Sequence, residues 1–411
     1  MLRLHPFRAI RPHEAKAEEV ASVPYDVVNR QEARALAEGH VNNFLHVVRS
    51  EIDLPDEVGP YDAVVYERAR ENFTRMMKES VLIQEEGESL YLYRQIMGEQ
   101  SQVGLVGCCH IDDYETNIIK KHEHTRKVKE DDRTRHVLAI NANSGPVFLT
   151  YRQDAAVDGL VDEEMKNAPV LYDFTSPDGV RHTVWRVVNP SAFVDAFGGV
   201  EAAYVADGHH RSASAWRAGQ EKRKANPNHG GDEEYNWFLS VLFPDNQLNI
   251  LPYNRVVKDL NGQSPAEVIK KLQSVGTFER TENPEPGHTG SFCFYLAESG
   301  WYCLTLDSAL IDSADPIASL DVALLHDRVL GPIFNIGDPR TDDRVDFVGG
   351  IRGTKELESR VDSGEWACGV SMFPTTIEQL LRVADADRVM PPKSTWFEPK
   401  LRSGLFSHLL D

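Results

Sequence analysis

The chain has 411 residues, with 44 lysines and arginines against 64 aspartates and glutamates, and so a formal net charge of −20 at pH 7. This length predicts two or three domains, and a hydrophobic fraction of 41% supports packed cores, which excludes a wholly disordered chain. The acidic balance argues against nucleic acid as a main partner, because binding a phosphate backbone requires a broad basic face. No apolar run reaches the ~20 residues of a membrane span, and the charged N-terminus lacks the apolar segment of a secretory signal. We therefore expect a cytoplasmic protein with no membrane partner.

Five cysteines without a C-x-x-C spacing predict neither a disulfide framework nor a zinc ribbon. Cys108 and Cys109 are adjacent in an apolar stretch, which predicts that both are buried rather than reactive.

The first half of the chain alternates helical and extended patterns. Asn29 is a candidate N-cap and Gly39 a candidate stop for one helix, and a short Gly-containing loop between two apolar runs predicts a hairpin. We expect helices at residues 29–39, 61–80, 126–143 and 157–167, and strands at 89–97, 102–111 and 145–151.

The second half continues this mixture. A polar, Gly-rich stretch at 225–234 predicts a surface loop, and Gly219 predicts the end of a helix that begins near 208. We expect strands at 181–188, 202–206, 236–244, 291–297 and 301–306, and helices at 191–197, 208–219, from about 264, and near 316–330. The mixture predicts an α+β or α/β chain in three segments, at residues 1–100, 101–260 and 261–411.

The first candidate site is the sequence VADGHHR at residues 205–211, where a predicted strand turns into a predicted helix. Backbone N–H groups at a helix N-terminus, together with His209, His210 and Arg211, favour phosphate binding. Asp207 is placed to hold a metal ion or to orient a nucleophile. The alternative interpretation is that Asp207 only caps the helix.

The second candidate is KKHEHTRKVKEDDRTRH at residues 120–136, where seven basic and four acidic residues give a local charge of +3. This charge predicts attraction of an anion, and Glu123 on the predicted turn is a candidate general base. The alternative is an exposed charged helix with i,i+4 pairs such as Lys127 with Asp131. A zinc site is a further hypothesis, although no H-E-x-x-H pattern is present; its ligands would come from His122, His124, His209, His210 and Asp207.

Two weaker candidates remain. The first follows two prolines and would bind a phosphate through Lys393, Ser394 and Thr395, but the glycines of a P-loop are missing. Packing of the aromatic residues that follow explains the segment equally well. The turn VPYDVV at 23–28 carries a single acid, Asp26. Neither a G-x-G-x-x-G nor a G-x-S-x-G pattern occurs, so dinucleotide binding and α/β-hydrolase chemistry lose support.

Four motifs together, SVPYDVV, KKHEHT with DDRTRH, VADGHHR and MPPKSTWF, resemble the mostly bacterial domain-of-unknown-function family 1015, over residues 22 to 397. Members of that family are similar to the ParB/sulfiredoxin superfamily, which includes free-serine kinases, and some are regarded as pyrophosphate-dependent serine kinases. The resemblance implies an α+β fold with a ParB/sulfiredoxin-like central domain between N-terminal and C-terminal α/β segments.

The resemblance also implies site residues. A general base falls on Glu123 and a second essential acid on Asp207, although 84 positions separate them, more than in the small serine kinases. Sulfiredoxins carry a nucleophilic cysteine where this chain has His209, which removes that activity. ParB-type DNA clamps need a basic surface that a charge of −20 does not favour.

The leading hypothesis is therefore a kinase that phosphorylates free L-serine, with pyrophosphate as donor and Mg²⁺ or another divalent cation as cofactor. The absence of a Gly-rich nucleotide loop favours a small donor. Glu123 would accept the serine proton, Asp207 would orient serine or metal, and, should Glu123 fail as the base, Asp26 or Asp132 is next. The expected phosphate-binding residues are His209, His210, Arg211, His124, Arg126, Lys129, Arg133, Lys393, Ser394 and Thr395.

Two alternatives stay open: a metal-dependent phosphatase acting on phosphoserine, and a non-enzymatic, ParB-like nucleotide-binding module. The metal ligands, the physiological direction and the oligomeric state are not determined by the sequence.

Overall fold

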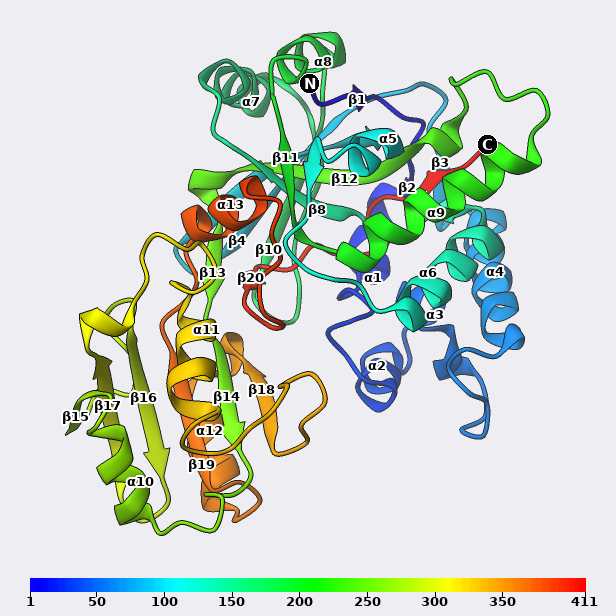
Figure 1. The fold of residues 1–411 in the computed structure, drawn as a ribbon. Helices are drawn as coiled ribbons and strands as arrows, with labels where there is room; N and C mark the ends of the chain where they lie inside the picture. Colours follow the sequence, from blue (N-terminus) through cyan, green and yellow to red (C-terminus); the bar gives the residue numbers. More distant parts are fainter. The chain divides into compact units, whose positions relative to one another are not determined.

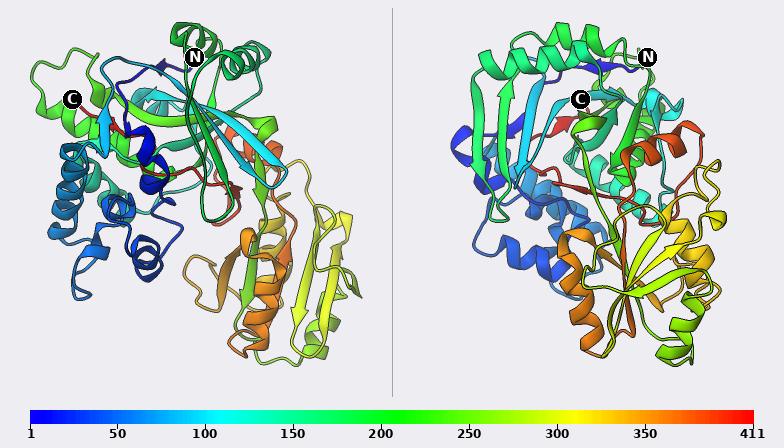
Figure 2. Two further views of the ribbon diagram at one scale, coloured as in Figure 1. Left: turned by 180° about the vertical axis from the view of Figure 1, so that it is seen from behind. Right: turned by 90° about the vertical axis from the view of Figure 1, so that its left-hand side faces the viewer.

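The structure is a computed structural model that describes residues 1–411. Its chain forms two compact units (Figures 1 and 2): the first comprises Met1–Leu248 and Pro399–Asp411, and the second Asn249–Glu398. The last residues of the chain thus return to the first unit. The predicted division into three segments differs from these two units in number and in boundaries, and it stays a prediction about domain organisation.

A nine-stranded mixed sheet forms the centre of the first unit. Two pairs of neighbours, β6–β11 and β8–β12, are parallel, and the other pairs are antiparallel. The path runs β6-β11-β8-β12-β5-β4-β10-β9, with β1 also paired to β5. The strands are β1 (Leu4–His5), β4 (Tyr91–Met97), β5 (Gln100–His110), β6 (Ile119–Lys120), β8 (Val147–Tyr151), β9 (Val170–Thr175), β10 (Arg181–Arg186), β11 (Ala203–Asp207) and β12 (Trp237–Pro244).

Both faces of this sheet are covered, which explains why its central strands are apolar in nearly every position. Leu105 and Cys109 of β5 pack in one core cluster, while Val106 and Cys108, which point to the opposite face, are also fully buried. The prediction that both cysteines are buried is confirmed, and burial raises the pKa of Cys109 to about 12.

Most predicted helices of the first unit are present. Asn29 caps α2, as the sequence predicted, and Glu32 completes a capping box with it. Helices α6 and α9 lie side by side (Figure 1). The helices are α1 (Ala17–Val20), α2 (Arg30–Ala37), α3 (Leu45–Val48), α4 (Ala63–Lys78), α5 (Ile111–Glu115), α6 (Lys127–Ile140), α7 (Ala155–Asn167), α8 (Pro190–Phe197) and α9 (His209–Ala225), with the 3-10 turns η1 (Glu14–Lys16), η2 (Ser50–Asp53), η3 (Glu234–Asn236) and η4 (Asp245–Gln247). Two short strand pairs complete the unit, β2 (Ile10–Pro12) with β3 (Leu82–Gln84) and β7 (Ala142–Asn143) with β21 (His408–Leu409).

The second unit has a six-stranded antiparallel sheet in the order β15-β17-β16-β19-β14-β18. Its strands are β14 (Tyr253–Val257), β15 (Gly276–Arg280), β16 (Ser291–Leu296), β17 (Gly300–Leu306), β18 (Val345–Gly349) and β19 (Cys368–Met372), with a separate pair, β13 (Asn249–Leu251) and β20 (Trp396–Glu398). Its helices are α10 (Pro265–Leu272), α11 (Asp321–Leu325), α12 (Gly353–Asp362) and α13 (Ile377–Asp385); a π-helical turn, His326–Leu330, continues α11.

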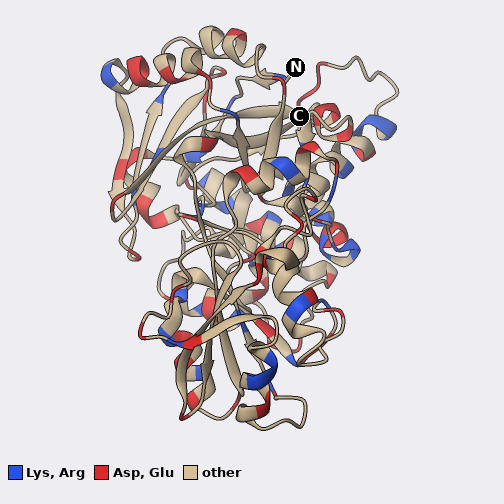
Figure 3. Ribbon diagram, turned by 60° about the vertical axis from the view of Figure 1, so that its left-hand side comes forward, with Lys and Arg blue, Asp and Glu red and all other residues tan.

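Charged residues of both signs are interspersed along the helices and loops of each unit (Figure 3). No helix in the structure combines the length and the apolar character that crossing a bilayer requires. The mixed α/β character that the sequence predicted is confirmed.

The predicted end of the helix at Gly219 is wrong, because α9 continues to Ala225. The glycine lies inside the helix for a packing reason. A Cβ on Gly219 would lie 2.5 Å from the carbonyl oxygen of Tyr235 and 2.6 Å from Cδ1 of Ile111. Gly219 therefore permits close approach of α9 to the chain beside it rather than ending the helix.

We predict that Gly219→Ala destabilises the protein by about 1–3 kcal/mol, the usual cost of overpacking against a backbone that cannot move. Gly159→Ala is the matched control, since Gly159 lies in the exposed part of α7 and a Cβ there would meet no atom within 4 Å. This control should stabilise by about 0.5–1 kcal/mol through helix propensity. Urea unfolding of both variants measures the difference, and equal effects would contradict the packing explanation.

Candidate functional site

Two parallel neighbouring strands bring the two predicted acids to one edge of the first unit's sheet. Ala203 of β11 pairs with Ile119 of β6, and Tyr204 pairs with Lys120. The chain continues from β6 into the loop that carries Glu123, and β11 ends at Asp207. Because parallel strands end on the same side of a sheet, residues 84 positions apart in the sequence meet there.

The turn after β11 depends on Gly208. Its φ of +94° lies in the left-handed region, and a Cβ there would come within 2.9 Å of Nε of Arg211. Gly208 lets the chain turn sharply from the strand into α9, so the unpaired N–H groups of the first helical turn face the same edge. This is the strand-to-helix turn that the sequence predicted.

Asp207 is held between two cations. Lys400 Nζ donates a hydrogen bond to Oδ1 at 3.1 Å, and Arg211 Nη2 donates to Oδ2 at 2.5 Å. Burial alone would raise the pKa of Asp207, but the charges of Lys400 and Arg211 and the hydrogen bond from Lys400 hold that pKa well below its ordinary value. The carboxylate is therefore ionised near pH 7.

Several buried nitrogens beside this carboxylate have no hydrogen-bond partner within the protein. They are Nε2 of His209, both ring nitrogens of His122, and Nε of Arg211. The His122 and His209 rings meet edge to face at 4.5 Å, and the two residues are 1% and 6% exposed. Buried polar groups are nearly always paired, so a cluster of unpaired ones indicates a place that binds polar groups from outside the chain.

Glu123 joins the cluster through His209, whose Nδ1 lies 3.9 Å from Oε2 of the glutamate. The side chain of Glu123 is 41% exposed, so it is open to solvent and to small molecules. Burial lowers the pKa of His209 to about 4, against the opposing charge of Asp207. Burial also lowers the pKa of His122, with a further contribution from His209. Both imidazoles are consequently neutral near pH 7.

The other residues predicted to bind phosphate differ in their surroundings. His210 Nε2 accepts a hydrogen bond from the backbone N–H of Arg126 at 3.1 Å, which links the helix to the Glu123 loop. The His124 side chain in that loop is exposed. Lys129 lies over the ring of Tyr61, at 5.3 Å from its centroid, and so has an aromatic contact of its own.

Arg133 lies beneath the same edge and connects the site to the predicted N-terminal turn. It pairs with Asp132 at 2.9 Å and stacks over the ring of Tyr25 at 4.4 Å. Tyr66 O–H donates to the other oxygen of Asp132 at 3.0 Å. Asp132 is therefore engaged in the interior, which makes it a poor substitute for Glu123 as a base. Asp26 is exposed; its charge, after that of Asp207, helps to raise the pKa of Arg211 against the effect of burial.

A small cavity of about 30 Å³ lies against these arginines. Cavities of this size hold about one or two water molecules, too few for a substrate. Its polar lining includes Tyr25, Arg133, His136, Ser144 and Arg211. The DDRTRH motif thus contributes Arg133 and His136 to the same cavity that Arg211 lines.

Lys393, Ser394 and Thr395 belong to the second unit. There, Ser394 O–H donates to the carbonyl of Pro391 at 2.6 Å, and the Ser394 carbonyl accepts from Thr375 at 2.9 Å. These bonds hold the loop, and Lys393 has a positive φ of 57° with its Nζ over the ring of Tyr253. A phosphate-binding role for this loop stays a prediction.

The principal residue that sequence reasoning missed is Lys400. It follows the MPPKSTWF motif within the same tail, but a single lysine carries no spacing that points to a partner 193 positions away. The sequence pointed to His122 only as a zinc ligand. The cluster of three metal-ligating residues that the structure contains lies elsewhere, so it lends no support to that zinc hypothesis.

We predict a pH dependence of stability from His209. Its folded pKa of about 4 is below the unfolded value near 6.5, so unfolding takes up a proton between these values and stability falls as the pH is lowered from 6.5 to 4. His209→Asn should remove up to about 1.4 kcal/mol per pH unit from this slope.

Urea unfolding at several pH values between 7 and 4.5 measures the slope. His40→Asn, at an exposed position, is the control and should leave it unchanged. An unaltered slope in His209→Asn would show that this imidazole is not held neutral by burial.

Comparison with solved structures finds only distant similarity. A conserved hypothetical protein from Pyrococcus furiosus is 13% identical, with a TM-score of 0.33, over 72% of this chain and 94% of that one. A free serine kinase in complex with AMP is 14% identical, with a TM-score of 0.33, over 72% and 90% of the two chains. C-terminally truncated SbnI from Staphylococcus aureus is 12% identical, with a TM-score of 0.38, over 74% and 87%. No curated protein matches the sequence.

Comparison of the sequence with models of protein families gives a clearer match than the solved structures do. The model described as "Protein of unknown function (DUF1015)" matches residues 4–323, which include the Glu123 loop, the Asp207 turn and part of the second unit. The match covers well over half of the chain and confirms the family resemblance; it includes three of the four motifs, while MPPKSTWF lies beyond the matched residues. This chain belongs to the DUF1015 family.

Proposed function

We propose that this protein is a phosphotransferase that transfers a phosphoryl group to the hydroxyl of free L-serine, with pyrophosphate as donor. The observation that carries the proposal is the group of unpaired buried nitrogens around the ionised Asp207 at the N-terminus of α9. Phosphoryl transfer depends on positioning and on neutralising charge, and this edge supplies both cations and N–H donors. The family resemblance supports the choice of serine and pyrophosphate. A ParB/sulfiredoxin-like core is part of the same proposal.

The donor phosphates would bind at the start of α9. The N–H groups of the first turn, Nε of Arg211 and the neutral imidazole of His209 all have hydrogen-bonding capacity that the protein does not use. Lys400 adds a second positive charge on the other side of Asp207. His210, Arg126, Lys129 and His124 would give weaker, longer-range attraction.

The acceptor would bind between the two acids. Glu123 is solvent-accessible and is placed to take the proton of the serine hydroxyl as the oxygen attacks phosphorus. Asp207, held rigidly by Lys400 and Arg211, would accept a hydrogen bond from the serine ammonium group or orient the attacking oxygen. Because its two cations fix its position, Asp207 is suited to orientation and Glu123 to proton transfer.

A divalent ion such as Mg²⁺ fits the chemistry of these residues. Mg²⁺ is usually held by one or two carboxylates together with substrate phosphates, and Glu123 and Asp207 are the candidate carboxylates here. When bound, the ion would neutralise charge on the transferring phosphoryl group. The protein's own contribution remains the fixed positions of Arg211, His209 and Lys400.

The donor is tested by phosphorus NMR of the purified protein with Mg²⁺, serine and, in turn, pyrophosphate, ADP and ATP. We expect phosphoserine and orthophosphate from pyrophosphate, and poor turnover with ATP. A far higher kcat/KM with a nucleotide would replace the donor and keep the kinase. Hydrolysis of phosphoserine without any acceptor would establish the phosphatase alternative, and no reaction under any condition would contradict the proposal.

The roles of the two acids are tested by Asp207→Asn and Glu123→Gln. Each should lower turnover by at least ~10²-fold, the scale of removing one acid–base or electrostatic group. Glu67→Gln is a control at an exposed surface carboxylate of α4 and should leave turnover unchanged. Circular dichroism checks that each variant is folded. Near-wild-type turnover in Glu123→Gln would assign the base to Asp26, and the same result in Asp207→Asn would remove the proposed site.

A further inference from the structure

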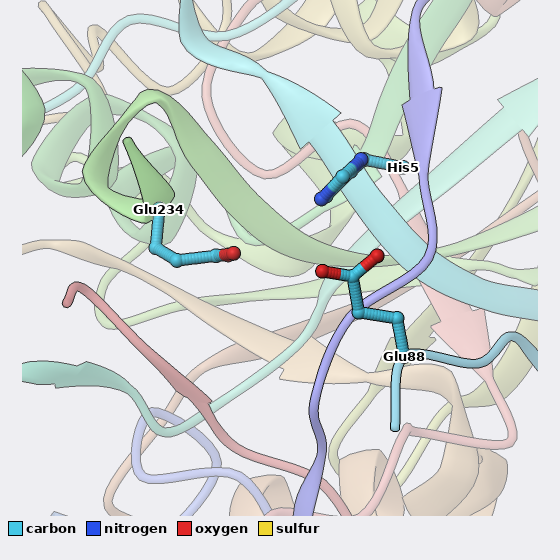
Figure 4. A group of neighbouring side chains, drawn as sticks. All are labelled: His5, Glu88 and Glu234. Atoms are coloured by element: carbon cyan, nitrogen blue, oxygen red, sulfur yellow. The ribbon is translucent and has the colours of Figure 1, made fainter. Parts of the chain in front are cut away.

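A second cluster of ionisable side chains lies elsewhere in the first unit, at the end of β5 and the start of β12. One ligand atom each from His5, Glu88 and Glu234 lies within 4.8 Å of the others. Figure 4 shows the three side chains pointing toward one another from three separate parts of the chain. None of these residues belongs to the motifs around Asp207.

The backbone that carries these residues is firmly connected. His5 of β1 pairs with Cys108 of β5, and Trp237 of β12 pairs with His110 of the same strand. Next to Glu88, the Phe7 and Ser89 backbones exchange hydrogen bonds of 3.0 and 3.1 Å. His5 thus lies in a paired strand, Glu88 directly precedes a paired residue, and Glu234 lies in the turn that leads into β12, so all three are attached to ordered backbone.

Two of the side chains are oriented by neighbours. The His5 ring stacks on the ring of Trp237, with centroids 4.6 Å apart and planes at 23°. An oxygen of Glu234 lies 2.6 Å from Nε2 of His408, a residue that is 2% exposed and whose other ring nitrogen has no partner. A ligating carboxylate that is itself hydrogen-bonded is the usual arrangement around protein metals, because the second bond fixes its orientation.

The charges also favour a cation. Glu88 and Glu234 bring two carboxylates together, and the charges of His408, His5 and Arg8 act on Glu234. Arg8 donates through Nε to the carbonyl of Glu85. A cation bound between the two carboxylates would add to the compensation that these neighbours already give.

We propose that His5, Glu88 and Glu234 form a binding site for a divalent ion of the zinc class, with a water molecule as fourth ligand and His408 as a positioning residue. One imidazole and two carboxylates suit Zn²⁺ better than Mg²⁺, which seldom binds imidazole. Bonds of about 2.0 Å in a tetrahedron place ligand atoms roughly 3.3 Å apart, so the site closes by a small movement of its exposed member, Glu88. The bound ion would connect β1 to η3 and, through His408, to the C-terminal strand β21.

The test is isothermal titration of Zn²⁺ into the full chain after chelator treatment, without serine or pyrophosphate. We expect one equivalent bound tightly, a rise in Tm, and four-coordinate visible absorption with Co²⁺. His5→Ala and Glu88→Gln should each weaken this binding by at least ~10-fold, and Glu88→Gln is safe for folding because the residue is exposed. His408→Gln should weaken it ~10–100-fold while leaving the stoichiometry unchanged.

His229→Ala is the matched control. His229 lies 2.8 Å from Glu233, a histidine–glutamate pair that has no third ligand beside it, and its loss should leave the strong site intact. A dissociation constant for Zn²⁺ above ~100 µM, or the same affinity in His5→Ala as in the wild type, would overturn the proposal. Neither result depends on phosphotransferase activity, so this experiment tests the metal-site proposal independently of the proposed function.

Discussion

The ion pairing of Asp207 with Lys400 and Arg211 is the interaction on which the candidate site depends. Lys400 comes from the tail that returns to the first unit, and Arg211 from the first turn of α9. Removing either cation would leave the carboxylate of Asp207 with only one positive partner, which is costly for a charge that is largely removed from water. The same pairing keeps Arg211 extended past Gly208, so that its Nε remains unpaired next to the neutral His209.

The two acids of the candidate site lie in unequal surroundings. Asp207 has lost its freedom to take up a proton, because two positive charges stabilise its ionised form. Glu123 lies in a solvent-accessible loop, with the neutral His209 at 3.9 Å. Enzymes that need one carboxylate for orientation and another for proton transfer achieve the difference through such unequal environments.

The sequence predicted the local parts of this site well and its assembly poorly. The strand-to-helix turn at 205–211 follows from Asp207 and Gly208 alone, and the structure confirms it. That Glu123 lies near this turn follows from the parallel pairing of β6 with β11, which no local pattern encodes. Lys400 could not be predicted for the same reason, since its contact with Asp207 depends on the path of a whole second unit inserted between them. The end of α9 differs from the sequence prediction because Gly219 serves packing against Tyr235 rather than termination.

The central claim is that the unpaired nitrogens around Asp207 bind phosphate groups. Nitrogen-15 NMR of the histidine rings tests it most directly, with the His209 signal assigned by its loss in His209→Asn. On addition of pyrophosphate and Mg²⁺, we expect the His209 Nε2 resonance to shift in a saturable way, while that of the exposed His40 stays in place. Saturable binding of pyrophosphate with no change at His209, or no binding at all, would contradict this claim.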